Sequence, residues 1–232
     1  MEKWGAAPSE YWWGNDIDFR YRAIDLLKNA RAERVLEIGC GCGVALSFSR
    51  ADLQVGFDVV VGSLMVARKI ALEAELVLCD GANMPVREKV FQLTVMNCVL
   101  DYMDKPKGRQ VLEECGRTST PDGVIAIFEV NPDSCTYRTY KGRMLDVQEV
   151  ENEIKAHYWH VSTTYFNPLP GNLTRALGAI VRGLRMGQLQ EHVHSAILRG
   201  LQNRRFKKSR SYATIGYKDT RSLERIVRGW PF

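Results

Sequence analysis

The stretch that most constrains this chain is VLEIGCGCG (Val35–Gly43), where a short apolar run leads into three alternating glycines. Glycine directly after a buried strand permits a tight turn and lets the backbone approach a ligand closely. When a helix follows, its free N–H groups point to the same place. The stretch therefore indicates a strand–loop–helix unit whose loop binds a ligand, as in open parallel α/β sheets.

Further apolar runs follow at the spacing expected of such a sheet. They are nearly continuous rather than alternating, which is typical of strands covered by helices on both faces. The predicted strands are Arg34–Ile38, Leu53–Asp58, Leu76–Asp80, Phe91–Val99, Gly123–Val130, Tyr158–Phe166 and Ser211–Tyr217, and the predicted helices between them are Gly62–Leu72 and Lys107–Arg117. We expect an α/β fold of the Rossmann-like, doubly wound type, with a mostly parallel seven-stranded sheet.

The chain length of 232 residues predicts a single domain. We divide it into an N-terminal helical cap (1–32), a cofactor-binding core (33–131) and a substrate-side segment (132–232). Apolar residues at helical spacing predict a helical insertion over about 172–206, before the last strand. The cap contains a predicted first helix, with Asn15 or Asp16 as its N-cap and Ile17, Ile24 and Leu27 on one face.

Composition narrows the class of protein further. No apolar run reaches about 18 residues, so no transmembrane segment is expected. The N-terminal stretch lacks the pattern of a secretory signal, and we expect an intracellular, cytoplasmic protein. The six cysteines form no metal-binding pattern, so we expect reduced thiols and no metal site. The net charge of +5 is uneven: residues 171–232 carry 13 Lys and Arg against 3 Asp and Glu.

An acid closes each of the first three predicted strands, at Glu37, Asp58 and Asp80. A dinucleotide fingerprint would require a third glycine at position 44, where this chain has Val44, and its pyrophosphate would avoid Glu37. A ligand with an ammonium group would instead favour Glu37. Asp58 follows Gly39 by 19 residues, near the spacing at which an acid accepts hydrogen bonds from ribose hydroxyls.

Five motifs in order then resemble those of the class I S-adenosylmethionine-dependent methyltransferases. The resemblance covers roughly residues 33 to 131. The five stretches are VLEIGCGCG, GFDVVVGSLMVARK, LCDGANMPV, FQLTVMNCVLDYM and VLEECGRTSTPDGVIAI.

The resemblance implies a cofactor, S-adenosylmethionine with S-adenosylhomocysteine as its product, and a methyl transfer by in-line displacement. Glu37 would lie at the amino end of the methionine part, Asp58 at the ribose, Asp80 at the adenine and Asn97 at the reacting centre. The cofactor-binding residues that it implies are Glu37, Gly39, Cys40, Gly41, Gly43, Asp58, Val59, Asp80, Gly81, Ala82 and Asn97.

A catalytic base is harder to assign from the sequence. His157 and His160 flank an aromatic pair, and Glu129 and Asp133 follow the fifth strand, where such enzymes often contact substrate. Each of these four could instead be structural. His192 and His194 fall in the predicted insertion and are weaker candidates.

The acceptor is expected to be a small molecule or a lipid. The segment Asn97–Leu100 lacks the prolines typical of amino-methylating nucleic-acid enzymes, and Cys98 is not preceded by proline as in cytosine-C5 enzymes. The basic residues 171–232 leave open an RNA or protein acceptor, or contact with an anionic surface. The glycine loop is also compatible with a non-catalytic cofactor-binding module or with a dehydrogenase.

Overall fold

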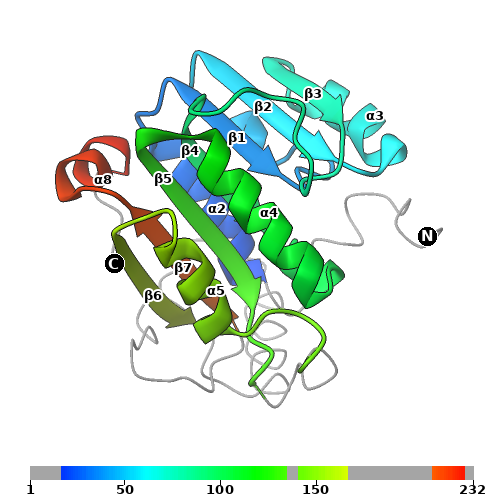
Figure 1. Ribbon diagram of the computed structural model, residues 1–232. Helices are drawn as coiled ribbons and strands as arrows, with labels where there is room; N and C mark the ends of the chain where they lie inside the picture. The colour runs from blue at the N-terminus through cyan, green and yellow to red at the C-terminus, as the bar shows by residue number, and fades with distance from the viewer. Residues whose placement is uncertain (1–16, 135–140, 167–210, 228–232) are drawn as a thin grey trace, which may run out of the picture.

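Seven strands form one sheet in the computed structural model of this chain, which describes residues 17–134, 141–166 and 211–227 (Figure 1). The strand order is β3-β2-β1-β4-β5-β7-β6, with β1 to β5 parallel and β7 antiparallel to both of its neighbours. The strands are β1 (Arg34–Ile38), β2 (Leu53–Asp58), β3 (Ala74–Leu78), β4 (Phe91–Asn97), β5 (Ser119–Val130), β6 (His160–Phe166) and β7 (Ser211–Tyr217). The predicted Rossmann-like, mostly parallel seven-stranded sheet is confirmed.

Helices cover both faces of the sheet (Figure 1). The helices α4 and α5 pack on one face and α2 and α8 on the other, and each face has its own apolar core. The helical elements are α2 (Ile17–Asn29), η2 (Leu46–Phe48), α3 (Val61–Ile70), η3 (Leu100–Tyr102), α4 (Lys105–Thr118), α5 (Val147–Lys155) and α8 (Thr220–Ile226). Burial on both faces explains why the central strands read as continuous apolar runs.

For three strands, β1, β2 and β7, the predicted first and last residues are those observed in the structure. The third strand ends at Leu78 rather than Asp80, because the Asp80 carbonyl accepts the backbone N–H of Asn83 in a turn. The fifth begins at Ser119 rather than Gly123. Its first residues pair irregularly with β4, where the register shifts between Phe91 and Leu93.

Two helices were not predicted from the sequence, α5 and α8, although each has a clear N-cap. Asp146 and Glu149 form a capping box at α5, with reciprocal bonds of 2.8 and 3.0 Å between side chain and backbone. The Asp219 carboxylate accepts the N–H groups of Arg221 and Ser222 at α8. Both helices have fewer than ten residues, too short for apolar periodicity to be visible.

The first helix is confirmed, and its buried face includes Leu27 of the expected residues, with Ile24 packed against the same core. Ala23, Leu26 and Leu27 are buried, whereas Ile24 is only partly buried. The proposed caps Asn15 and Asp16 and the insertion 172–206 lie outside the described residues, and nothing in the structure tests the division into three parts.

Candidate active site

The acids predicted as ligand contacts come together at one edge of the sheet. Since β1 to β4 are parallel, their carboxyl ends share this edge, and Glu37, Asp58 and Asn97 lie in adjacent strands there. Asp80 follows β3 by two residues. Open α/β sheets bind ligands beyond this edge.

Each of the three loop positions requires glycine for a different structural reason. All have positive φ, +66° at Gly39, +52° at Gly41 and +73° at Gly43. A Cβ on Gly39 would lie 2.6 Å from Val99 Cγ2, and one on Gly43 would lie 3.0 Å from the Ala67 Cβ. A Cβ on Gly41 would meet nothing within 4 Å. Gly41 is therefore the glycine whose backbone faces open space, where a ligand can approach.

The helix expected directly after the loop is only a single turn. The element η2 has three residues and is of the 3₁₀ type. Part of the ligand contact expected from a helix N-terminus would then fall to the loop's own backbone and to the acids beside it.

Asp58 ties the glycine loop to the end of β2. One carboxylate oxygen accepts the Gly41 N–H at 2.8 Å and the other accepts the Val60 N–H at 2.8 Å. A carboxylate has about four acceptor positions, so this one can also accept hydrogen bonds from two hydroxyl groups. Beside it, the Val59 and Leu78 side chains are 64% and 55% exposed and offer an apolar surface at the same edge.

Asp80 has a partner that the sequence did not suggest. Its carboxylate accepts the Ala82 N–H at 3.1 Å and forms an ion pair with Lys107 in the first turn of α4. The hydrogen bond from Lys107 holds the pKa of Asp80 below its usual value. Gly81 follows with little room, since a Cβ there would lie 3.1 Å from Ile38.

Glu37 is a buried acid with unused hydrogen-bonding capacity. Its side chain is 3% exposed, and among the described residues its Oε2 has no hydrogen-bond partner. Burial raises its pKa to about 8, while a hydrogen bond from the Leu46 backbone opposes this and the charge of Asp58 adds to it. The raised pKa favours the protonated form of Glu37 at neutral pH. Burial likewise raises the pKa of the Cys40 thiol beside it.

Asn97 ends β4, half-buried, directly before an unusual turn. The next residue, Cys98, has a φ of +56°. The Cys98 thiol lies 3.8 Å from the Asn97 side-chain oxygen. The end of β4 thus brings Asn97 to the edge that it shares with Glu37 and Asp58.

The candidate bases lie elsewhere or are already engaged. His160 begins β6 and stacks on Tyr217, which pairs with Val124, so His160 lies at the level of the amino ends of the parallel strands. His157 comes just before it and lies against Gly116 of α4. Both histidines therefore lie toward the amino ends of the parallel strands, at the edge opposite Glu37. His192 and His194 lie outside the described residues.

The two acid candidates near the end of β5, Glu129 within the strand and Asp133 after it, are both engaged by other groups. Glu129 is fully buried, and its carboxylate accepts three backbone N–H groups at 2.8 to 2.9 Å. Burial and the nearby Asp101 raise its pKa, and the three backbone hydrogen bonds oppose that rise. Asp133 is exposed and lies 3.4 Å from the Lys141 ammonium.

Three buried hydroxyls lie near the carboxyl end of β5. Ser134, Ser211 and Tyr212 are each 0% exposed, and in the described part of the chain their hydroxyls have no hydrogen-bond partner. Tyr212 pairs with Glu129 in the sheet. Buried hydroxyls without partners are uncommon, and a bound polar group or water often explains them.

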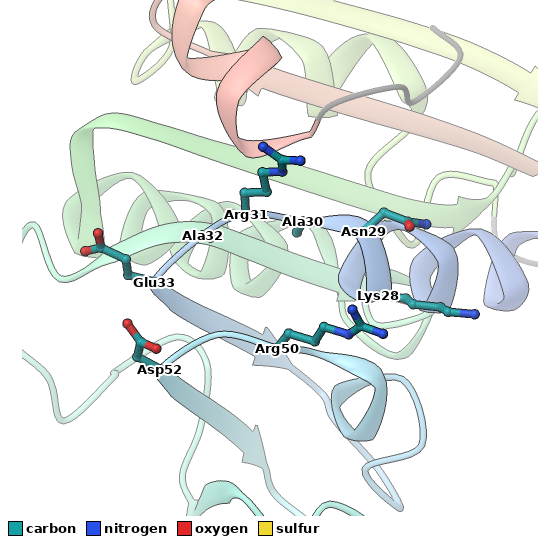
Figure 2. Close-up of a pocket in the computed structure, with 8 residues that line it drawn as sticks. All are labelled: Lys28, Asn29, Ala30, Arg31, Ala32, Glu33, Arg50 and Asp52. Carbon is teal, nitrogen blue, oxygen red and sulfur yellow. The ribbon is translucent and has the colours of Figure 1, made fainter.

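A separate hollow of 480 Å³ lies at the other edge of the sheet, between the end of α2 and the amino ends of β1 and β2 (Figure 2). Glu33 and Asp52 line one side of it, and Lys28 and Arg50 line the other. It is open and lined mainly by charged and polar groups, unlike the enclosed, largely apolar sites that hold small organic ligands. It is also remote from the acids above, so we assign it no part in the reaction.

The described residues contain neither a metal cluster nor a membrane-crossing helix. Within them no group of three or more metal-ligating side chains is positioned to hold an ion. In the same ranges, no helix is long and apolar enough to cross a membrane. The described cysteines are not joined in disulfides.

Part of the chain matches a known protein family. Residues 35–123 match the family model described as a methyltransferase domain. A demethylmenaquinone methyltransferase from Thermotoga maritima is 30% identical over 124 residues, which are 51% of this chain and 53% of that protein. An uncharacterized protein from Methanocaldococcus jannaschii is 25% identical over 128 residues, 55% of this chain and 59% of that one. The matches thus span little more than half of these relatives.

Solved structures resemble the chain over most of its length. A Thermotoga maritima S-adenosylmethionine-dependent methyltransferase, a possible histamine N-methyltransferase, has a TM-score of 0.63 at 14% identity, covering 91% of this chain and 94% of that one. The N-methyltransferase NodS from Bradyrhizobium japonicum, solved with S-adenosylhomocysteine, has a TM-score of 0.61 at 15% identity, covering 94% and 95%. At such identities the likeness concerns the fold.

The family match and the fold agree with the five motifs. Residues 35–123 match a methyltransferase domain, and the chain shares its fold with S-adenosylmethionine-dependent methyltransferases of known structure. The cofactor of such a domain is S-adenosylmethionine.

The residues at the sheet edge fit this cofactor. Gly41 leaves open space for a close approach, and Asp58 has acceptor positions for ribose hydroxyls. Glu37 offers a buried oxygen, without a partner among the described residues, to an ammonium group. Val59 and Leu78 offer apolar surface to a purine ring.

Proposed function

We propose that this protein transfers the methyl group of S-adenosylmethionine to a small-molecule or lipid acceptor by in-line displacement. The observation that carries the proposal is the contact of Asp58 with Gly41, which joins an acid at the end of β2 to the loop glycine that faces open space. The bound cofactor would supply a methyl group bonded to a positively charged sulfur. When the methyl group is transferred, its bond to sulfur breaks and the sulfur is left as a neutral thioether.

The residues at the edge would divide the binding of the cofactor among them. Glu37 would accept the ammonium group, Asp58 the ribose hydroxyls and Asp80 the adenine amino group. Gly39, Cys40, Gly41 and Gly43 would form the loop under the methionine part, and Val59, Gly81 and Ala82 the wall around the adenine. Asn97 would face the reacting centre.

Little acid catalysis is required because the leaving group is neutral. Most of the rate would come from holding the acceptor atom in line with the methyl carbon and from excluding water. No base is assigned: His157 and His160 lie at the opposite edge, and the Glu129 oxygens are engaged by backbone N–H groups.

The small-molecule or lipid class of acceptor has two supports. The segment Asn97–Leu100 lacks the proline motif of amino-methylating nucleic-acid enzymes. The proteins compared above include a demethylmenaquinone methyltransferase and a possible histamine N-methyltransferase, whose names indicate acceptors of low molecular weight. The buried hydroxyls of Ser134, Ser211 and Tyr212 are candidates to bind a polar group of the acceptor.

An RNA or protein acceptor is the second candidate, favoured by the excess of basic residues in 171–232. The two classes differ in their response to salt, because contact with an anionic polymer weakens steeply as salt rises. A methyl-transfer assay with small amines, phenols, quinols and RNA, at low and high salt, separates them. A non-catalytic module would bind the cofactor and give no product with any acceptor.

The first test is calorimetric titration with S-adenosylhomocysteine, with NAD as the negative control. Wild-type protein should bind in the micromolar range, and Asp58→Ala should bind at least about tenfold more weakly, as expected when hydrogen bonds to a charged group are lost. Asp219→Ala is the matched control. Asp219 also accepts two backbone N–H groups, but it lies at the start of α8, away from the site. Absence of binding by wild-type protein would reject the proposal.

A further inference from the structure

Glu129 is a fully buried carboxylate that accepts hydrogen bonds from backbone N–H groups. It is 0% exposed, and its Oε2 accepts the N–H groups of Val99 at 2.9 Å and Leu100 at 2.8 Å. Its Oε1 accepts the N–H of Val130 at 2.9 Å. A single side chain on β5 thus binds the backbone of the segment that leaves β4.

That segment has a conformation that few side chains adopt without support. Cys98 has a φ of +56°, in the left-handed region that disfavours residues with a Cβ. The Cys98 N–H is bonded to the Phe128 carbonyl at 2.9 Å, and the two N–H groups that follow are those bonded to Glu129. Three successive backbone donors are therefore held by two adjacent residues of β5.

The same segment forms the support of the glycine loop. The Val99 side chain is 7% exposed, and a Cβ on Gly39 would lie 2.6 Å from Val99 Cγ2 and 3.4 Å from Val99 Cγ1. Val99 and Gly39 are thus in close contact, and a shift of Val99 would change the space beneath the loop. Gly39 begins the loop whose Gly41 is bonded to Asp58.

We infer that Glu129 is a positioning residue: by holding the turn at Cys98, Val99 and Leu100, it sets the position of Val99 under Gly39 and thereby the shape of the cofactor loop. This inference rests on the proposed function, since it concerns the same site. Glu129 acts through Val99 and touches no reacting atom.

The chemistry of the contact explains why a glutamate serves here. All three partners of Glu129 are N–H donors, so the site requires two oxygens that accept. A glutamine would turn its amide N–H₂ group toward one of those donors and lose at least one bond. The turn would then be held by fewer contacts while Cys98 still has to adopt a positive φ.

The test is a double-mutant cycle between Glu129→Gln and Cys98→Gly, read as the Kd of S-adenosylhomocysteine. Glu129→Gln should raise the Kd about tenfold. Cys98→Gly should leave it within about threefold of wild type, because glycine adopts positive φ without strain. The double variant should recover to within about threefold of wild type, because a turn that is no longer strained depends less on Glu129.

A general loss of stability is separated by a control and by a second measurement. Asp219→Ala removes two similar backbone contacts at α8, so it should lower stability and leave the Kd unchanged. Val99→Ala keeps the backbone donors but removes the contact with Gly39, and it should raise the Kd on its own. If Glu129→Gln binds as wild type does, or if the double variant is as weak as Glu129→Gln alone, the inference is wrong.

Failure of the proposed function gives a different result. If wild-type protein does not bind S-adenosylhomocysteine, the methyltransferase proposal fails. The double-mutant cycle can still be measured in that case, with the midpoint of urea unfolding in place of the Kd. Glu129→Gln and Cys98→Gly should then show non-additive changes in the unfolding midpoint. Additive changes would show that Glu129 does not hold the turn, and the inference would fall independently.

Discussion

Two buried glutamates at the same edge of the sheet have opposite hydrogen-bonding situations. Glu129 gives both of its oxygens to three backbone donors, whereas Glu37 has an oxygen without a partner among the described residues. The residue type is the same, but the first is suited to hold a turn and the second to bind a cation. Sequence reasoning treated both as candidate site residues, because the donors around each come from other parts of the chain.

Glu37→Gln is expected to stabilise the protein at neutral pH and to weaken cofactor binding. The Glu37 pKa is about 8, raised from an ordinary value of 4.5. Between these values the unfolded chain releases the proton and the native state keeps it, so stability falls as pH rises. Glutamine removes this loss. At pH 7.5 we expect a gain of roughly 1–3 kcal/mol in the free energy of unfolding.

Urea unfolding at pH 5 and pH 7.5 checks this prediction. The stability gained by Glu37→Gln should be smaller at pH 5, because that pH is only slightly above the ordinary pKa of a glutamate and little of the pH-dependent loss has accumulated. Glu114→Gln is a control of opposite sign, because the hydrogen bond with Arg117 lowers the Glu114 pKa. That variant should lose stability at pH 7.5. A loss of stability in Glu37→Gln at pH 7.5 would contradict the assignment of a buried, protonated Glu37.

Tyr212→Phe is expected to separate acceptor binding from cofactor binding. The Tyr212 hydroxyl is buried without a partner among the described residues, so its removal should raise stability by about 1 kcal/mol. If the hydroxyl binds the acceptor, the KM for the acceptor should rise several-fold while the Kd of S-adenosylhomocysteine stays the same. An unchanged KM would remove Tyr212 from the acceptor site.

The glycine loop is a single element whose three glycines are required for different reasons. Gly39 and Gly43 are tightly packed against Val99 and Ala67, and Gly41 faces open space. The alternating pattern was visible in the sequence, but the division of roles depends on residues from α3 and from the turn after β4. Sequence spacing alone assigned the three glycines one common role.

Alanine substitutions in the loop should reveal this division. Gly41→Ala should cost about 1–2 kcal/mol of stability, from its positive φ alone, and should weaken S-adenosylhomocysteine binding by more than about tenfold. Gly43→Ala should cost more stability, because its Cβ would lie 3.0 and 3.1 Å from the Cβ atoms of Ala67 and Ala71. Thermal unfolding and calorimetry measure the two effects. Equal losses of stability would contradict the packing difference.

The accuracy of the predicted bounds varied from strand to strand: those of β1, β2 and β7 match the structure, whereas β4 ends at Asn97 rather than Val99 and β5 begins at Ser119 rather than Gly123. Strands β1 and β2 are continuous apolar runs because both of their faces are buried, so their bounds are visible in the sequence. The edge strand β3 is only partly buried, and its end was misplaced by two residues. The short helices α5 and α8 depend on caps at Asp146 and Asp219.

At the scale of the whole molecule, the two apolar cores lie on opposite faces of one sheet and share its strands. Residues of β1, β4 and β5 point alternately into one core and the other, so neither core can be lost alone. The described part of the chain should therefore unfold in one cooperative transition.

Ligand binding should shift that transition as a unit. At about one hundred times its Kd, S-adenosylhomocysteine should stabilise the native state by about 2.7 kcal/mol. For a chain of this size we expect Tm to rise by roughly 5–10 °C. Differential scanning calorimetry measures this, and NAD at the same concentration should leave Tm unchanged. A Tm unaffected by S-adenosylhomocysteine would count against cofactor binding.

Apolar periodicity and glycine spacing are local properties, so the fold class, the order of the strands along the chain and the acids near their ends could be predicted from the sequence. Which of those groups are available to a ligand depends on contacts made in the folded protein. In the folded protein Glu129 accepts hydrogen bonds from backbone donors and Asp80 is paired with Lys107. His157 and His160 lie at the opposite edge of the sheet from Glu37. The physical reason is that availability depends on neighbours from other strands, which no local pattern records.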